Sequence, residues 1–346
     1  MKQEIISKVL YLLLAFVLIL GFNVGHAAGQ VKKVEWKVQC VYPTTAVTTI
    51  NMVAISKIIE RRTEGNFQIK IFGPGQLVKE RELFTAVSKG MVEGGVSNLN
   101  YYSKIIPVAE AKYGPFLAMD NQELAYLMLE TDYPKPIRKE CAGQNIFFVG
   151  STPTHPAVLI SRKSVRTLAE MRGFKVRGAG IYNEIARAWG AIPISIDPAE
   201  MYTALQQGTM DGVFYPIVAS VRYKLHEQIK YVIQPGPFET CADFFVTHDS
   251  YNALPGEWQK MLIDTFMKVA VTDAVEVGKE EFKEKETFLK KVGVEFIYWS
   301  DADVRKAKEL CEPIREKFKA GSPASAEVIA IAEKALEEYR RKYSTK

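Results

Sequence analysis

The chain has little of what most metal-binding and catalytic sites need. Its 346 residues include only four histidines and four cysteines, and none of them is spaced as in a zinc-binding motif. It also lacks a glycine-rich phosphate loop, a G-x-S-x-G elbow and a calcium-binding loop. Acidic residues are numerous, yet none forms a recognisable general acid/base pair. We therefore expect no catalytic residues, no metal and no cofactor.

Cysteine is too sparse to build a disulfide framework. Cys40, Cys141, Cys241 and Cys311 lie far apart, and no C-x-x-C spacing occurs. A secreted protein is exposed to an oxidising compartment that permits disulfides. Because no dense pattern is present, we expect buried, unpaired thiols.

Long apolar runs are also absent, apart from one at the start of the chain. Lys2 and Lys8 precede an apolar stretch over residues 9–24, and small residues follow it. This order is typical of a secretory signal peptide, and the run is short for a membrane span of about 20 residues. We expect cleavage after Ala27, with Ala28 as the alternative, and a periplasmic mature protein. No cysteine ends the run, which argues against a lipoprotein.

The charge balance is mild. The chain carries 45 basic and 40 acidic residues, a net charge of +5. Such a balance slightly favours anionic partners and is far from the basic stripe of a nucleic-acid-binding protein. With 47% hydrophobic residues, the chain is long enough for about two domains. We expect a monomer with no nucleic-acid partner.

Short β-branched runs alternate with amphipathic segments, as in α/β proteins. The pattern predicts helices at residues 46–63, 79–89, 121–139, 181–189 and 198–207. It predicts strands at residues 33–42, 67–72, 94–99, 146–150, 157–161, 174–177, 192–196 and 211–215.

Two segments of the chain resemble each other. Residues 83–96 read LFTAVSKGMVEGGV and residues 201–214 read MYTALQQGTMDGVF. Each reads as a helix, a glycine that ends the helix, and a strand. The identical pairs are Thr85/Thr203, Ala86/Ala204, Gly90/Gly208 and Gly94/Gly212. We interpret the likeness as two lobes of similar build; chance similarity of two αβ turns is the alternative.

Two such lobes would place their loops on one cleft, because ligands bind beyond the carboxyl ends of strands in open α/β sheets. The loop after the first repeat offers Asn98, Asn100 and Tyr101. The loop after the second offers Phe214 and Tyr215, of which strand alternation sends one inward. We favour Tyr215 as the side chain that faces the cleft.

The last third of the chain is helical. Residues 257–291 contain no proline and only Gly278 as a glycine. At 1.5 Å per residue this helix would be about 50 Å long, enough to bridge both lobes. From Asp301 onward the chain is helical and highly charged, with a break at residues 321–323.

Residues 174–215 resemble the signature of the DctP family, the solute-binding subunits of tripartite ATP-independent periplasmic (TRAP) transporters. The stretch reads FKVRGAGIYNEIARAWGAIPISIDPAEMYTALQQGTMDGVFY. Its matching elements are Lys175-Val176-Arg177, Gly190-Ala191, residues 200–206, Gly208 and Asp211-Gly212. Upstream, Gly75-Gln76-Leu77 and Gly90 also match.

The resemblance implies an α/β, two-lobed periplasmic-binding-protein fold of class II type, with a long helix spanning both lobes. Lobe I would comprise residues 28–153 and 243–282, and lobe II residues 154–242 and 283–346. The resemblance further implies that Arg177 holds a ligand carboxylate, and that the protein delivers this organic acid to sodium-driven TRAP membrane subunits. A structural ion pair is the other interpretation of Arg177. A secreted α/β enzyme acting on a small organic acid is the alternative function.

Two departures from the family pattern bear on the ligand. The region where many relatives have a second arginine contains His155 and no arginine, and Tyr215 stands where many have asparagine. We therefore expect a monocarboxylate with an apolar or aromatic part. His155 is a further ligand-binding candidate, because it opens a strand of lobe II. A sulfonate is the alternative, because a guanidinium binds either anion. The sequence leaves the identity of the ligand open.

Overall fold

The computed structural model describes residues 33–178, 180–196 and 200–343. The chain divides into an N-terminal unit, Met1–Val34, and a compact unit, Glu35–Lys346, which holds the fold. The expected signal peptide and its cleavage site lie outside the described residues.

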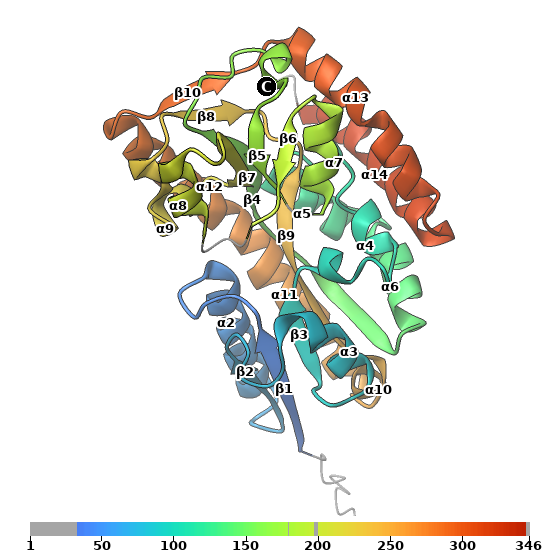
Figure 1. The fold of residues 1–346 in the computed structure, drawn as a ribbon. Helices are drawn as coiled ribbons and strands as arrows, with labels where there is room; N and C mark the ends of the chain where they lie inside the picture. Colours follow the sequence, from blue (N-terminus) through green and yellow to red (C-terminus); the bar gives the residue numbers. More distant parts are fainter. Residues whose placement is uncertain (1–32, 179, 197–199, 344–346) are drawn as a thin grey trace, which may run out of the picture. The chain divides into compact units, whose positions relative to one another are not determined.

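One mixed β-sheet is built from two halves with the same strand arrangement (Figure 1). Each half contains a run of four strands; the second is parallel to the third, and the third is antiparallel to the fourth. The first half-sheet has the order β2 (Phe67–Phe72), β1 (Val34–Cys40), β3 (Gly94–Ser97), β9 (Glu239–Thr247). The second has the order β6 (Ile192–Ile194), β5 (Lys175–Arg177), β7 (Gly212–Pro216), β4 (Ile146–Ser161). The predicted α/β class and repeated build are confirmed.

A glycine of the internal sequence repeat stands at the start of a strand in both half-sheets, for the same structural reason. Helix α3 (Leu83–Ser88) leads to β3, and α8 (Met201–Gln207) leads to β7. A Cβ atom on Gly94 would approach the backbone oxygen of Phe245 to 3.1 Å, and one on Gly212 would approach that of Ile160 to 2.7 Å. A side chain would clash with the antiparallel neighbour at Gly212 and crowd it at Gly94, which favours glycine at the start of both strands.

Strand β4 joins the two half-sheets. Residues 146–156 pair with β9, whereas residues 157–161 pair with β7, and 159–161 also with β8 (Tyr231–Gln234). The sequence predicted two separate strands here, and that prediction was wrong. The polar and proline-containing stretch between them stays extended because β9 pairs with it, and register shifts near Gly150 and His155 absorb the irregularity.

The helix expected at residues 121–139 is two helices. Helix α5 (Asn121–Glu130) ends at the extended residue Thr131, and α6 (Pro134–Ala142) has proline in its first turn. Proline has no backbone N–H to donate to the preceding turn but fits the first turn of a new helix.

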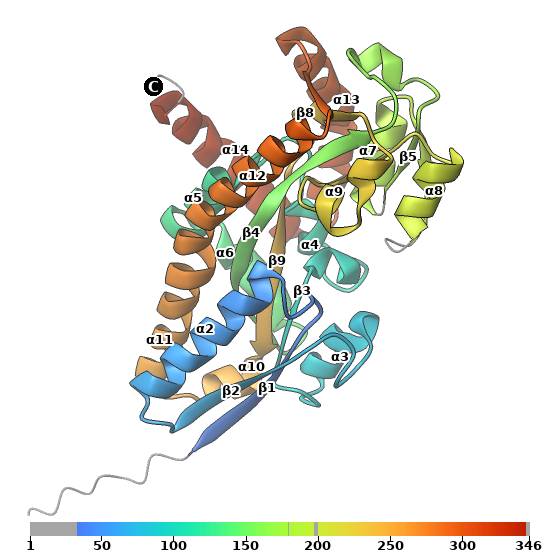
Figure 2. The same ribbon diagram turned by 90° about the vertical axis from the view of Figure 1, so that its left-hand side faces the viewer.

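The long helical segment of the last third runs from residue 256 to 291. It consists of α11 (Gly256–Phe266), a π-helical stretch (Met267–Asp273) and α12 (Ala274–Lys291). Helix α11 packs against α2 (Val47–Arg62), and α12 against β10 (Glu295–Tyr298), which pairs with β8. Figure 2 shows the segment in orange, running from α2 up to β8.

Two further helices close the chain, with the break where the sequence predicted it. Helix α13 (Asp301–Lys319) packs against α7 (Ile181–Ala188) and α4 (Val108–Ala111). Helix α14 (Pro323–Tyr343) packs against α4, α5 and α6. Two further short α-helices are α9 (Ala219–Arg222) and α10 (His248–Asn252). Within the described ranges, no helix has both the length and the apolarity of a membrane span.

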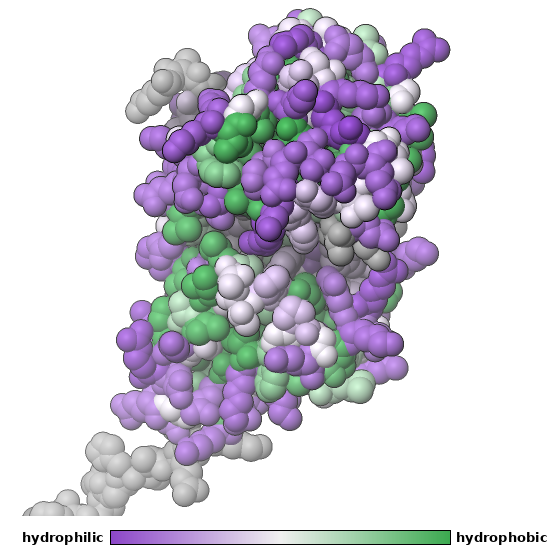
Figure 3. Space-filling model, turned by 60° about the vertical axis from the view of Figure 1, so that its left-hand side comes forward, coloured by the Kyte–Doolittle hydropathy of each residue, from purple (hydrophilic) through white to green (hydrophobic). Residues whose placement is uncertain are grey.

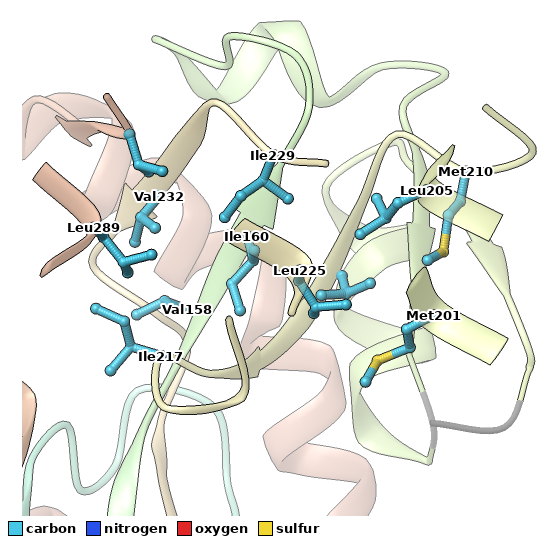
Figure 4. Close-up of a cluster of buried hydrophobic side chains, with 12 residues drawn as sticks. Val158, Ile160, Met201, Leu205, Met210, Ile217, Leu225, Ile229, Val232 and Leu289 are labelled. Carbon is cyan, nitrogen blue, oxygen red and sulfur yellow. The ribbon is translucent and has the colours of Figure 1, made fainter. Parts of the chain in front are cut away.

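An apolar core fixes the second half-sheet between its helices (Figure 4). Val158 and Ile160 of β4 meet Leu205 of α8 on one side and Leu289 of α12 on another. Each is almost fully buried, and burying such a side chain contributes roughly 1.5–3 kcal/mol. This packing holds β7 in place, β5 pairs with β7, and the carboxyl ends of these two strands carry the candidate site.

Candidate functional site

Arg177 is a buried cation at the carboxyl end of β5. Arg177 is 6% exposed, and its Nε donates to the backbone oxygen of Ile196 at 3.3 Å. Among the residues that the structure describes, no carboxylate lies within ion-pair distance of the guanidinium. A buried charge is costly unless an anion compensates it. The residue is therefore suited to receive an anion from outside the chain.

Several tyrosines lie near this guanidinium or near one another. The Arg177 Cζ lies 5.4 Å from the centroid of the Tyr215 ring, and the Tyr223 ring meets Tyr215 edge-on at 6.0 Å. Burial raises the pKa of Tyr182. The neighbouring Tyr215 and Tyr101 raise this pKa further, and the Arg177 charge lowers it. The pKa of Tyr42 is likewise raised by burial and by Tyr101. We call Tyr42, Tyr101, Tyr182, Tyr215 and Tyr223 the tyrosine cluster.

Both half-sheets supply members of the cluster. Tyr42 and Tyr101 follow β1 and β3, whereas Tyr182 and Tyr215 lie after β5 and at the end of β7. These are the carboxyl ends of the parallel strands, where open α/β sheets bind ligands. Figure 3 shows one face of the molecule hollowed midway between its upper and lower parts.

The loops of the two half-sheets touch each other. A Cβ atom on Gly180, in the loop after β5, would lie 3.2 Å from the Asn100 Nδ2 atom. The Oδ1 atom of Asn100 is buried and has no hydrogen-bond partner among the described residues. Asn98 serves its own loop, because its side chain accepts from the Asn100 backbone N–H at 2.9 Å and donates to the Cys241 backbone oxygen at 3.4 Å. Of the predicted residues, Tyr101, Tyr215 and Asn100 therefore come close to Arg177 or its loop.

Phe214 and His155 lie differently. Phe214 is 1% exposed, and its ring packs on Tyr182 and Trp189, so it backs the tyrosine cluster from the interior. The His155 Nε2 atom lies 3.0 Å from the Glu281 Oε2 atom on α12, and this hydrogen bond lowers the pKa of Glu281. No described contact joins His155 to the tyrosine cluster.

The sequence reasoning missed Tyr42, Tyr182 and Tyr223. Tyr42 and Tyr182 occupy equivalent places in the two half-sheets, after β1 and β5. Applying the carboxyl-end rule to these strands as well would have found both. Tyr223 lies just beyond α9, and no sequence pattern connects it to β7.

A second group of polar side chains is fully enclosed. Lys112, at the end of α4, contacts Asp243 Oδ1 through Nζ, with Ser151 Oγ at 3.1 Å and Cys241 Sγ at 3.3 Å. The Lys112 and Asp243 side chains are 2% and 0% exposed. A void of about 10 Å³, the size of one water molecule, lies beside Lys112, Ser151 and Cys241. We call Lys112, Ser151, Cys241 and Asp243 the Lys112 cluster.

The thiols behave as structural groups. All four cysteines are buried and unpaired, which confirms the prediction. Burial raises the pKa of Cys241 to about 12, which suppresses the reactive thiolate. Across the described ranges, no group of histidine, cysteine and acidic side chains has the arrangement of a metal site.

Comparison with known proteins places the chain among solute-binding proteins. Residues 40–321 match the family model described as bacterial extracellular solute-binding protein, family 7. A monocarboxylate 2-oxoacid-binding periplasmic protein of Nostoc is 25% identical over 245 residues, 69% of this chain and 67% of that protein. The 2,3-diketo-L-gulonate-binding periplasmic protein of Escherichia coli is 24% identical over 293 residues, 82% of this chain and 88% of that protein.

A solved structure agrees. A TRAP periplasmic solute-binding protein from Desulfovibrio salexigens with bound orotic acid superposes with a TM-score of 0.78 at 25% identity. The superposition covers 88% of this chain and 99% of that one.

Proposed function

Because this chain belongs to family 7 of the bacterial extracellular solute-binding proteins, the DctP family, we propose that it captures a small organic acid anion in the periplasm. The anion is a monocarboxylate, held by Arg177 in a cleft between two lobes. The protein then delivers it to the membrane subunits of a TRAP transporter. Family membership, the periplasmic relatives and the absence of an acid/base pair in the sequence support a binding protein rather than an enzyme.

The observation that carries the proposal is the charge of Arg177, which no carboxylate among the described residues compensates. A carboxylate entering the cleft loses its hydration and needs charge-assisted hydrogen bonds in return. A guanidinium presents two parallel N–H donors that match both carboxylate oxygens. Because no described carboxylate pairs with Arg177, the ligand can supply the missing anion.

The surrounding charges favour one carboxylate rather than two. Glu80 and Arg81 also act on the pKa of Tyr101; they are adjacent in the chain and opposite in sign. Arg177 is buried and has no carboxylate of the described residues within ion-pair distance, so it offers one position for a ligand carboxylate. The rings of the tyrosine cluster provide apolar faces and hydroxyl groups for the rest of the molecule. A planar or partly apolar monocarboxylate fits this lining best.

The lobes are expected to close over the ligand by bending at the strands that connect them. We propose that lobe I comprises residues 28–153 and 243–282, and lobe II residues 154–242 and 283–346. Strand β4 supports this division because it changes partners from β9 to β7 near residue 156.

A thermal-shift screen tests the proposed function. The panel contains pyruvate and orotate as monocarboxylates, malonate as a dicarboxylate, and ethanesulfonate and toluenesulfonate as sulfonates. A bound compound raises the unfolding temperature in proportion to RT ln(1 + [L]/Kd) and is recovered unchanged. We expect a monocarboxylate to stabilise the protein most. Stabilisation by malonate or a sulfonate alone would contradict the ligand class, and turnover would contradict a binding protein.

A further inference from the structure

The loop that carries Tyr101 is held by strand β9 from beneath. Asp243 Oδ2 accepts the backbone N–H of Leu99 at 2.8 Å, and the backbone oxygen of Cys241 accepts from Asn98 Nδ2 at 3.4 Å. Leu99 begins the single 3₁₀ turn Leu99–Tyr102. A turn this short has few hydrogen bonds of its own, so these two anchors help to fix its orientation, together with the buried side chains of Leu99 and Tyr102.

Asp243 is itself fixed from three directions. Its backbone pairs with Ser97 of β3 and with Ser151 of β4. Its Oδ1 atom accepts from Ser151 Oγ at 2.6 Å and contacts the Lys112 ammonium group. The other carboxylate oxygen, Oδ2, is thus directed at the Leu99 amide by a side chain that has no freedom to rotate.

The anchored loop presents groups toward Arg177. Asn100 lies against the Gly180 backbone in the loop that follows Arg177. Tyr101 is exposed on this loop; partial desolvation raises its pKa, and the nearby Arg177 charge lowers it. Tyr102, the last residue of the turn, donates from its hydroxyl to the backbone oxygen of Glu80 at 2.6 Å. A displacement of Leu99 would therefore move Asn100, Tyr101 and the Glu80 segment together.

We propose that Asp243 is a positioning residue for ligand capture: it sets the Leu99–Tyr102 loop so that Tyr101 and Asn100 close the site opposite Arg177. The proposal rests on the proposed function, because it takes the Arg177 site as the place where the anion binds. Lys112 and Ser151 act through Asp243 and do not touch the ligand.

A purely structural role for the same ion pair makes a different prediction. Replacing both members of a buried ion pair by uncharged side chains is often neutral for stability. A structural pair would then tolerate any well-packed uncharged replacement. A positioning residue requires in addition that position 243 keep an acceptor for the Leu99 N–H.

Two double variants separate these roles. Lys112→Met with Asp243→Asn removes both charges but keeps an amide oxygen that can accept from Leu99. Lys112→Met with Asp243→Leu removes the same charges and the acceptor. If the second unfolds, Lys112→Met with Asp243→Thr replaces it, because threonine suits a strand but is too short to reach the Leu99 amide. Arg177→Ala is measured beside them.

Titration with the tighter-binding of pyruvate and orotate gives the affinities, and amide hydrogen exchange without ligand reports the loop. We expect the Asn variant to bind within about threefold of wild type. We expect the Leu variant to bind roughly tenfold to a hundredfold more weakly, the effect of losing a hydrogen bond to a charged group. Its faster exchange should be confined to residues 97–102.

Equal affinities of the two double variants, or faster exchange spread evenly over the fold, would overturn the positioning role. If Arg177→Ala binds as wild type does, the proposed site itself is wrong. If Arg177→Ala loses binding while both double variants bind normally, the proposed function stands and only the role of Asp243 falls. The exchange measurement needs no ligand, so it tests the loop anchor even if neither compound binds.

Discussion

Arg177 and Lys112 are both cations that the fold removes from water, but their surroundings differ. They are 6% and 7% exposed. The Lys112 ammonium group meets Asp243, Ser151 and Cys241, an acceptor for each of its three protons. Arg177 meets the backbone oxygen of Ile196 and the face of Tyr215, and no carboxylate among the described residues.

The presence or absence of a counter-ion therefore distinguishes a structural charge from a ligand-binding charge better than burial does. A buried cation with its anion already in place has no capacity left for a ligand. A buried cation that meets only dipoles and aromatic rings keeps its donors for an incoming anion. Three variants test this distinction, ordered from the largest expected effect to the smallest.

Lys112→Met should destabilise the protein by about 3–5 kcal/mol, because it leaves the Asp243 carboxylate buried without its partner. Methionine keeps most of the volume of the lysine chain, so the effect arises from the charge. Urea unfolding followed by circular dichroism measures it. Combining the change with Asp243→Asn should recover much of the loss. A single variant within about 1 kcal/mol of wild type would show that the pair does not behave as a buried ion pair.

Arg177→Ala should leave unfolding nearly unchanged and weaken anion binding by about 2–5 kcal/mol, which is a roughly 30- to 4,000-fold higher Kd. Arg177→Lys should recover only part of the affinity, because lysine offers a point charge instead of a planar fork. Calorimetric titration with the best monocarboxylate of the screen measures both variants. Arg187→Ala, at an exposed position of α7, is the matched control. Arg177→Ala binding within a few-fold of that control would place the anion elsewhere.

Glu239 extends the comparison to a buried carboxyl group without a described cation. It is 4% exposed, accepts from the Thr154 backbone N–H at 3.2 Å, and faces the Asn121 amide. Burial, followed by the Asp120 charge, raises its pKa well above the usual value. The folded protein therefore holds this proton to a higher pH than the unfolded chain does. Stability from this group declines as pH rises from about 4.3 through the raised folded pKa.

Glu239→Gln should flatten that decline, because glutamine resembles the protonated carboxyl group and does not titrate. We expect the variant to gain stability relative to wild type toward the alkaline side of a pH 5 to 8 series of urea midpoints. Glu327→Gln, at an exposed position of α14, controls for the change in net charge. An unchanged slope in Glu239→Gln would mean that Glu239 is ionised in the folded state and finds compensation for its charge.

Local patterns predicted most of the elements, and they failed where a distant segment overrode them. Helix α2, strand β2 and the break between α13 and α14 follow from periodicity and from glycine and proline positions. Strand β4 did not, because the polar stretch at residues 151–156 is extended only through pairing with β9, some 90 residues later in the chain. No window around residue 153 contains that information.

For the candidate site, the chain by itself determined the family, through the pattern around Arg177, and the repeated halves, through glycines that a close neighbouring strand demands. The chain also predicted Tyr101 and Tyr215 as ligand-binding residues, because each lies at or shortly after the end of a strand. Only the tertiary structure decided which charges are compensated. Lys112 meets Asp243 from 131 residues away, and Tyr101 lies near Tyr182 and Tyr215 of the opposite half-sheet. The physical reason is that the free energy of a charge depends on the atoms within a few ångströms of it, and chain order does not specify those neighbours.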